Sequence, residues 1–258
     1  MKVVATYSIK GGVGKTSAAV NLGALAAREG LRTVIWDLDP QGAASFLLRV
    51  RPKVKGGGRK LVRGRRDPID VMKGTDFEGL DLLPADFSYR HLDIELDKRK
   101  RPLRGLSRVL DQLGDDYDLA VVDCAPSISL VSESMFTAAD LLLVPIIPAT
   151  LSVRTFEQLQ HFLARAPEPV PGVLAFLSMV DRRKRLHREL AASLPASLPT
   201  VADVAIPSAS VIERMGVERA PVVTTKPRSA AAQAYRDLWQ RVRADLDGLP
   251  PGSDPATR

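Results

Sequence analysis

The chain has 258 residues, 45% of them apolar, which is enough to bury the core of one large α/β domain. Its net charge of +7 favours a polyanionic partner. A single cysteine, Cys124, excludes internal disulfides and reads as a small buried residue, while three scattered histidines give no metal-ligand spacing. With no signal-peptide pattern and no apolar stretch of roughly 18 residues, we expect a cytoplasmic protein.

The chain begins with an apolar run over 2–8 that predicts a buried strand, and a glycine-rich loop comes directly after it. Glycines allow successive backbone N–H groups to converge on phosphate oxygens where a helix begins. Lys15 would meet the β- and γ-phosphates of a nucleotide, and the Thr16 hydroxyl would ligate Mg²⁺. The residues expected to bind the phosphates are Lys10, Gly11, Gly12, Val13, Gly14, Lys15, Thr16 and Ser17.

Lys10 is the unusual residue of this loop. The ordinary phosphate-binding pattern would have glycine where this chain has Ile9, and Lys10 adds a second ammonium beside the phosphates. That ammonium either clamps the nucleotide of its own subunit or reaches the nucleotide of a neighbour. The alternative is a glycine-rich turn that carries a solvated lysine.

Acidic residues end two further apolar strands. Asp37 and Asp39 end the strand predicted over 32–37, and Asp123 ends the strand predicted over 118–123. Ligands of doubly wound folds bind beyond the carboxyl ends of the strands, so one site can gather these acids and the loop. We expect Thr16 and Asp123 to hold Mg²⁺, with Asp37 as a candidate for its outer shell. Taken alone, the Asp37 and Asp39 pair could equally end a strand and cap the next segment.

A basic insertion spans 49–66 and carries no acidic residue, so the rest of the chain is slightly acidic. Without aromatic residues, such a loop suits non-specific phosphate contacts that weaken steeply with salt. The alternative is a flexible, solvated insertion that binds nothing in particular. Its candidate DNA contacts are Arg49, Arg51, Lys53, Lys55, Arg59, Lys60, Arg63, Arg65 and Arg66.

The remaining elements complete an alternating pattern that predicts a doubly wound, mostly parallel sheet with helices on both faces. Residues 1–247 are predicted to form one domain, and 248–258 a disordered, proline-rich tail. Strands are expected near 2–8, 32–37, 80–84, 118–123, 140–146, 172–178 and 201–206. Helices are expected near 15–29, 42–48, 102–114, 129–138, 151–165, 184–194 and 229–246, the last with Tyr235, Leu238, Val242 and Leu246 on its buried face.

The loop and the two acidic strand ends resemble the ParA/MinD family of P-loop ATPases with a deviant Walker A motif, whose signature is Lys-Gly-Gly-x-Gly-Lys-[Thr/Ser]. Matching segments cover residues 2–246. The resemblance implies a slow, partner-stimulated ATP hydrolase that uses Mg²⁺. It assigns Asp39 to positioning the attacking water, so the expected catalytic residues are Lys10, Lys15 and Asp39. It also implies that Lys10 crosses to the other subunit's ATP, so that ATP assembles a homodimer.

The resemblance further implies that Pro207 contacts adenine. Ala209 stands where relatives carry an asparagine, which leaves the backbone to read the base. In the late region, ParA relatives carry DNA-binding arginines, and Arg214 and Arg219 are the candidates here.

Three outputs of such a switch compete. A ParA-like dimer would bind non-specific double-stranded DNA on the nucleoid and position a cargo such as a plasmid, a chromosome or a protein complex, with a ParB-like or adaptor partner that stimulates hydrolysis. A MinD-like dimer would bind membrane through a C-terminal amphipathic helix, and a metabolic enzyme would phosphorylate a small substrate. The basic insertion favours the first, and the expected burial of the apolar face of the last helix makes membrane binding the weaker alternative.

Overall fold

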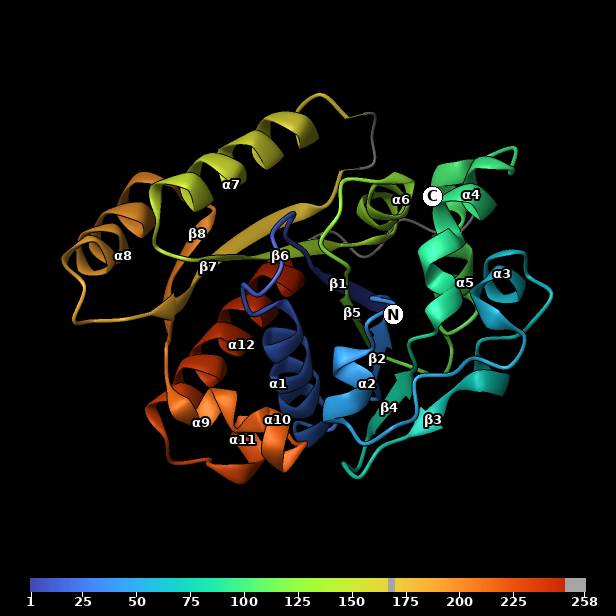
Figure 1. Ribbon diagram of the computed structural model, residues 1–258, viewed down its shortest axis with the longest axis horizontal. Coiled ribbons are helices and arrows are strands. Elements are labelled where there is room, and N and C mark those ends of the chain that lie inside the picture. The colour runs from blue at the N-terminus through green and yellow to red at the C-terminus, as the bar shows by residue number, and fades with distance from the viewer. Residues whose placement is uncertain (167–169, 249–258) are drawn as a thin grey trace.

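The computed structural model describes residues 1–166 and 170–248, and it is built around one sheet (Figure 1). In space the strands run in the order β3-β4-β2-β5-β1-β6-β7-β8. All neighbouring pairs are parallel except the short edge strand β3, which pairs antiparallel with β4. The strands are β1 Lys2–Thr6, β2 Thr33–Asp37, β3 Lys73–Gly74, β4 Leu80–Leu83, β5 Leu119–Asp123, β6 Leu141–Ile146, β7 Gly172–Val180 and β8 Val201–Pro207.

Helices cover both faces of the sheet, so central strands such as β5 are buried along their whole length. One face carries α1 Lys15–Arg28, α2 Ala43–Leu47, α9 Ser210–Glu213, α10 Met215–Glu218, α11 Val222–Thr225 and α12 Ala230–Gly248. The other carries α3 Gly57–Val62, α4 Leu92–Asp97, α5 Ser107–Asp111, α6 Leu130–Ala138, α7 Thr150–Leu163 and α8 Arg185–Ser197. The predicted doubly wound, mostly parallel fold is confirmed.

Adjacent residues of β1 show why two cores form. Val3 and Ala5 face one apolar cluster, while Val4 faces the other, as the period of two in a strand requires. Helix α1 packs closely on the second cluster at Gly23, where a Cβ atom would lie 2.7 Å from the Cδ1 atom of Ile35. This close approach brings the start of α1, and with it the glycine loop, against the sheet.

The strand prediction is confirmed, and the helix prediction is confirmed in part. Each expected strand is present, and only the two-residue edge strand β3 was not expected. The helix expected over 102–114 is instead a 3₁₀ turn, η3 Pro102–Arg104, followed by the short helix α5. Short elements that lack a full amphipathic period were not predicted: α3, α4, α9, α10, α11 and the 3₁₀ turns η1 Ile69–Val71 and η2 Phe87–His91.

Helix α12 buries the apolar face that was predicted for it. Tyr235, Leu238, Val242 and Leu246 are buried, and so is Trp239 beside them. Of the expected tail, Gly248 ends α12, and residues 249–258 lie outside the described residues. The apolar side of this helix is therefore used for packing within the domain.

The basic segment 49–66 is partly helical, whereas the sequence predicted a loop and left a flexible, solvated insertion as the alternative. It contains helix α3, and the side chains of Val54, Leu61 and Val62 are almost completely buried in the core. These few apolar residues, spread among nine basic ones, dock the segment against η2, α4 and α5, so the flexible alternative and the loop conformation are both wrong. The basic side chains therefore occupy defined positions on a folded element.

This docking gives a stability test. Replacing the buried Leu61 by alanine leaves a cavity, so Leu61→Ala should lower the free energy of unfolding by about 2 to 4 kcal/mol. The neighbouring Lys60→Ala removes an exposed side chain of the same helix and should change it by less than about 0.5 kcal/mol. Urea unfolding followed by circular dichroism measures both, and equal small effects would mean that the segment is not docked.

Candidate functional site

The site is built where three parallel strands end at the same edge of the sheet. Thr6 at the end of β1 and Asp37 at the end of β2 are both in register with Asp123 at the end of β5. The Thr6 hydroxyl lies 3.3 Å from Oδ1 of Asp123 and donates to it. The strand register alone therefore places two carboxylates next to the loop that comes after β1.

The glycine loop has the backbone shape that phosphate binding requires. Gly12 and Gly14 adopt left-handed φ angles of 69° and 96°, which side-chain-bearing residues rarely adopt. Gly14 directly precedes α1, and a Cβ atom there would lie 2.7 Å from Oγ of Ser178. The loop thus presents its backbone at the N-terminus of a 14-residue helix, where the helix dipole favours anions.

Lys15 is buried at the start of α1, and its positive charge opposes the rise that burial causes in the pKa of Asp123. Its Nζ atom donates to the carbonyl oxygen of Lys10, 3.0 Å away. Burial lowers the pKa of Lys15, and the negative charges of Asp123 and Asp39 oppose that shift. The loop therefore folds back on a lysine that is held beneath it.

The two strand-end carboxylates are buried and incompletely paired. Oδ2 of Asp37 accepts hydrogen bonds from the backbone N–H and the hydroxyl of Ser45, both at 2.7 Å. Burial raises the pKa of Asp37 to about 6. Burial and the nearby charge of Asp37 raise the pKa of Asp123 to about 7, although a hydrogen bond from Thr16 acts in the opposite direction. Oδ1 of Asp37 and Oδ2 of Asp123 are buried without a hydrogen-bond partner.

A divalent cation would give these two oxygens the partner that the protein does not supply. Within residues 1–166 and 170–248, no three His, Cys, Asp or Glu side chains form a metal cage. Mg²⁺ does not require one, since it keeps several waters and is held by one or two protein groups together with substrate phosphates. The Thr16 hydroxyl and the carboxylates of Asp123 and Asp37 supply oxygen donors of that kind.

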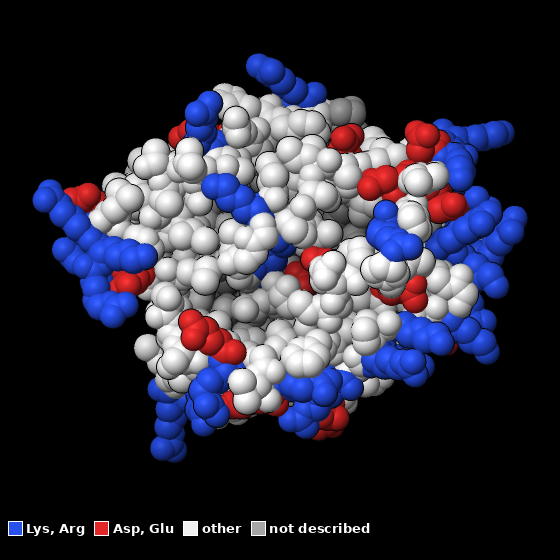
Figure 2. Space-filling view, viewed as in Figure 1, with Lys and Arg blue, Asp and Glu red and all other residues white. Residues whose placement is uncertain are grey.

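A cleft of about 570 Å³ runs from the glycine loop across the ends of the strands, and we call it the central cleft. Figure 2 shows it as a hollow near the middle of the face, with basic and acidic side chains inside. Asp39, half-exposed, lines it beside the loop, and Pro207 and Ala209 line its other end. Further lining residues that sequence reasoning did not identify are Gln41, Ser178, Met179, Ile212, Met215, Gly216 and Tyr235.

Met179 is the most unusual of the unpredicted residues. It has a left-handed φ of 56°, it lies where the β7–β8 register is irregular, and its side chain is 42% exposed. Non-glycine residues in this conformation are uncommon and concentrate at functional sites. Only the position of Met179 just before the end of a strand could have pointed to it, because no motif marks it.

Lys10 does not line the central cleft. It lies by a small neighbouring depression formed with α7 residues Ser152 and Thr155. Within the described part of the chain, no carboxylate pairs with its ammonium. The second loop lysine therefore stands beside the phosphate-binding turn rather than under it, in contrast to Lys15.

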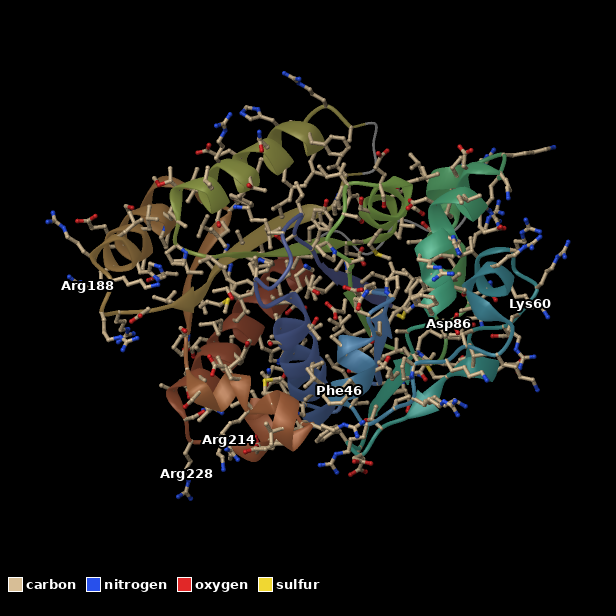
Figure 3. The ribbon with its side chains drawn as sticks, in the orientation of Figure 1. Phe46, Lys60, Asp86, Arg188, Arg214 and Arg228 are labelled. Carbon is tan, nitrogen blue, oxygen red and sulfur yellow. The ribbon has the colours of Figure 1, made fainter. Side chains whose placement is uncertain are left out.

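Two of the predicted DNA contacts, Arg49 and Arg219, are engaged within the molecule. Arg49 donates to the carbonyl oxygen of Glu218 and pairs with Asp76, while Arg219 donates to the carbonyl oxygen of Phe46 and stacks over its ring at 4.6 Å. Figure 3 shows Phe46 on α2 and Arg214 near α9 and α10. The two arginines thus join the ends of α2 and α10, beside the central cleft.

A second groove, of about 500 Å³, lies between α6 and α7 and is mainly apolar, with Phe136, Phe162 and Leu163 in its wall. Its lining contains no residue of the glycine loop and neither strand-end acid. The residues predicted to bind nucleotide therefore gather at the central cleft and not in this groove. Among the described helices, none is long and apolar enough to cross a membrane.

Comparison with known proteins agrees with this geometry. Residues 1–170 match a family described as AAA domain. Over 253 residues the chain is 30% identical to the sporulation initiation inhibitor protein Soj of Bacillus subtilis, covering 95% of this chain and 99% of Soj. It is 31% identical to the chromosome partitioning protein ParA of Caulobacter vibrioides, covering 94% of each. The chain belongs to the ParA/MinD family of P-loop ATPases.

Solved structures show that the family fold extends over nearly the whole chain. A cobyrinic acid a,c-diamide synthase from Mycobacterium smegmatis, with bound ATP analogue and magnesium, superposes with a TM-score of 0.78 at 25% identity over 96% of both chains. The cell division ATPase MinD of Pyrococcus furiosus shares the fold, with a TM-score of 0.77 at 23% identity over 94% of this chain and 98% of MinD. This ParA/MinD chain therefore has its glycine loop and acidic strand ends within the common fold.

The raised pKa of Asp123 predicts a pH-dependent stability in the absence of nucleotide and metal. The folded state holds the proton up to about pH 7, whereas the unfolded chain releases it near pH 4, so the contribution of Asp123 to stability falls as pH rises between these values. Asp123→Asn should remove this loss and raise the free energy of unfolding at pH 8 by on the order of 2 kcal/mol.

Urea unfolding at pH 5, 6, 7 and 8, with a chelator present, measures the effect. Asp203→Asn, at an exposed position of β8, is the matched control and should behave like the unsubstituted chain. A constant difference between Asp123→Asn and the unsubstituted chain at every pH would contradict the assignment.

Proposed function

We propose that this chain is a ParA-type ATPase that binds ATP with Mg²⁺, dimerises and holds non-specific double-stranded DNA, so that it associates with the nucleoid and positions a cargo. One observation supports the proposal: four groups meet at the carboxyl ends of the central strands. They are the glycine loop with its left-handed Gly12 and Gly14, the buried Lys15, and the incompletely paired carboxylates of Asp37 and Asp123. Such a set neutralises a triphosphate and holds its metal, which is most of what phosphoryl transfer requires.

In this proposal the backbone N–H groups of residues 11–17 and the Lys15 ammonium bind the β- and γ-phosphates. Mg²⁺, held through Thr16 and Asp123 with Asp37 behind them, would neutralise charge that develops on the phosphates. Asp39 would orient the attacking water, and its half-exposed position at the cleft wall supports that role. Pro207 and the backbone near Ala209 would contact adenine at the far end of the cleft.

Lys10 would act on the other subunit. Its position outside the central cleft and its unpaired ammonium are what a lysine that reaches a neighbouring nucleotide requires. If this ammonium meets the γ-phosphate bound by the partner, ATP gains a contact that ADP cannot make. A contact made by ATP and not by ADP shifts the equilibrium from monomer to dimer only when ATP is bound. Hydrolysis, slow until a ParB-like or adaptor protein stimulates it, would then release the dimer.

DNA is the favoured partner because the excess charge lies on a folded basic segment. A membrane-bound alternative needs a C-terminal helix with a free apolar face, but the large apolar side chains of α12, Trp239 included, are buried. A metabolic enzyme is the other alternative, since the synthase that superposes on the chain is 25% identical to it. The partition proteins Soj and ParA are 30% and 31% identical over most of the chain, which favours partition.

The role of Asp39 can be separated from nucleotide binding. Asp39→Ala should retain the ATP-dependent dimer, since the phosphate and metal ligands remain, and should reduce turnover at least ~100-fold because the water is no longer oriented. Phosphate release and analytical ultracentrifugation measure the two properties. Asp203→Ala serves as the control and should match the unsubstituted chain. Normal hydrolysis by Asp39→Ala would refute the assignment.

Nucleotide control of DNA binding is the direct test of the function. With ATP and Mg²⁺ the chain should shift a random-sequence duplex in a gel, and with ADP it should bind at least ~10-fold more weakly, because only ATP supplies the contact that assembles the dimer. The ATP complex should weaken steeply between about 50 and 200 mM salt. Equal binding in ATP and ADP would overturn the switch, and binding only to anionic vesicles would favour the membrane alternative.

A further inference from the structure

A second basic run lies between α4 and α5, and neither the glycine loop nor the expected DNA contacts involve it. Residues 98–108 contain no acid. In the structure this run packs against the basic segment 49–66, because α3 contacts both α4 and α5. Its basic residues are Lys98, Arg99, Lys100, Arg101, Arg104 and Arg108.

One buried carboxylate joins the two runs. Glu95 of α4 accepts from Arg63 at 2.7 Å, and it also lies 3.4 Å from Arg59 and 3.7 Å from Lys98. The Arg99 guanidinium donates to the carbonyl oxygen of Val62 at the end of α3. Segments about 40 residues apart in the sequence are thus held together as one surface, which we call the basic face: α3 with its flanking residues up to Arg66, and residues 98–108.

The basic face has more positive charge than its own acids neutralise. Glu95 forms ion pairs with three cations, and Asp70 forms one with Arg66. The pKa of Arg99 is lowered mainly by burial and, to a smaller extent, by the positive charges of Arg108 and Arg63. In the described part of the chain, no acidic partner holds Lys55, Lys60, Arg65, Lys100, Arg101, Arg104 or Arg108.

The figures show how this face is exposed. Figure 2 shows lysine and arginine side chains gathered along the right-hand edge, over α3, α4 and α5 as placed in Figure 1, with a few acidic side chains among them. Lys60 points outward from that edge in Figure 3. Several basic side chains outside the Glu95 network, such as Lys60, are therefore exposed to solvent and can meet a partner.

We infer that the basic face, formed by α3 and residues 98–108 together, is the surface of this chain that contacts the phosphate backbone of double-stranded DNA. The inference rests on the proposed function and locates its DNA contact. Each unpaired cation that meets a phosphate releases a counterion, so a face with several of them binds without reading sequence.

The chemistry of the face favours nucleic acid over a lipid surface. Membrane insertion requires apolar side chains that can leave the protein, but Leu61 and Val62 of α3 and Leu92 and Leu96 of α4 are buried in the core. The exposed ring of nearby Phe87 is covered by the Arg90 guanidinium at 3.9 Å. The basic face therefore offers many cations, and the large apolar side chains exposed beside it are the separate Phe87 and Ile94.

Hydrogen bonds connect this face to the central cleft. Ser45, which holds Asp37, also accepts from the backbone N–H of Ala85 through its hydroxyl oxygen. The next residue, Asp86, accepts from the backbone N–H groups of Val54 and Ser88, and Ser88 accepts from that of Gly58 in α3. Figure 3 shows Asp86 between α2 and α3. These hydrogen bonds link Ser45, which holds Asp37, to the first turn of α3.

The test removes unpaired cations only, so that the Glu95 network stays intact. The face variant combines Lys60→Gln, Arg65→Gln, Lys100→Gln and Arg101→Gln. The control combines Lys73→Gln, Arg165→Gln, Arg182→Gln and Lys184→Gln, which removes the same charge from exposed positions outside both the face and the late region. Affinity for a random duplex of about 30 base pairs is measured by fluorescence anisotropy with ATP and Mg²⁺ at several salt concentrations.

The face variant should lose at least ~10-fold in affinity, and its salt slope should fall by about 0.9 for each lost phosphate contact. The control should stay within about threefold, and both should keep the ATPase rate and melting temperature of the unsubstituted chain. Equal affinities for the two variants, whether retained or lost, would overturn the inference while leaving the proposed function standing. Failure of the unsubstituted chain to bind any duplex would refute the proposed function itself, and binding of anionic vesicles through the face would assign it to lipid.

Discussion

Two carboxylates end adjacent parallel strands at the same register, and the rest of the site depends on their burial. Asp37 and Asp123 are in register across β2 and β5, and each retains a buried oxygen without a partner. Placing two like charges together away from water is costly, and their raised pKa values express that cost. The fold tolerates it because Lys15 lies beneath the glycine loop and Ser45 holds one of the two carboxylates.

The same constraint explains why the site suits a switch. The protein neutralises this carboxylate pair incompletely, so a cation held by a triphosphate could complete the neutralisation. A ligand that binds only the folded state stabilises that state. Ser45 links the pair to α2, and through Ala85 and Asp86 the contacts continue to α3. In the proposed function, nucleotide binding and DNA binding would therefore share one hydrogen-bonded region between the central cleft and the basic face.

The local sequence pattern predicted the structure correctly where an element was long or where a motif was short and rigid. The apolar runs of β1, β2 and β5 and the amphipathic period of α12 predicted the sheet and one of its covering helices. Pattern was a poor guide where a few apolar residues decide the outcome: Val54, Leu61 and Val62 convert an apparent basic loop into a docked segment. Their effect depends on packing against η2, α4 and α5, which are distant in the sequence, and no local periodicity encodes that packing.

The sequence by itself determined the family, the sheet and the glycine loop, because glycine positions and strand hydrophobicity act through the local backbone and through burial on both faces. Tertiary structure alone decided how charge is distributed. It tied Arg49 and Arg219 across α2 and α10, left Lys10 outside the central cleft, and brought residues 98–108 against α3 around Glu95. Ion pairing depends on which residues meet in space, and charges distant in the chain meet only when the helices pack.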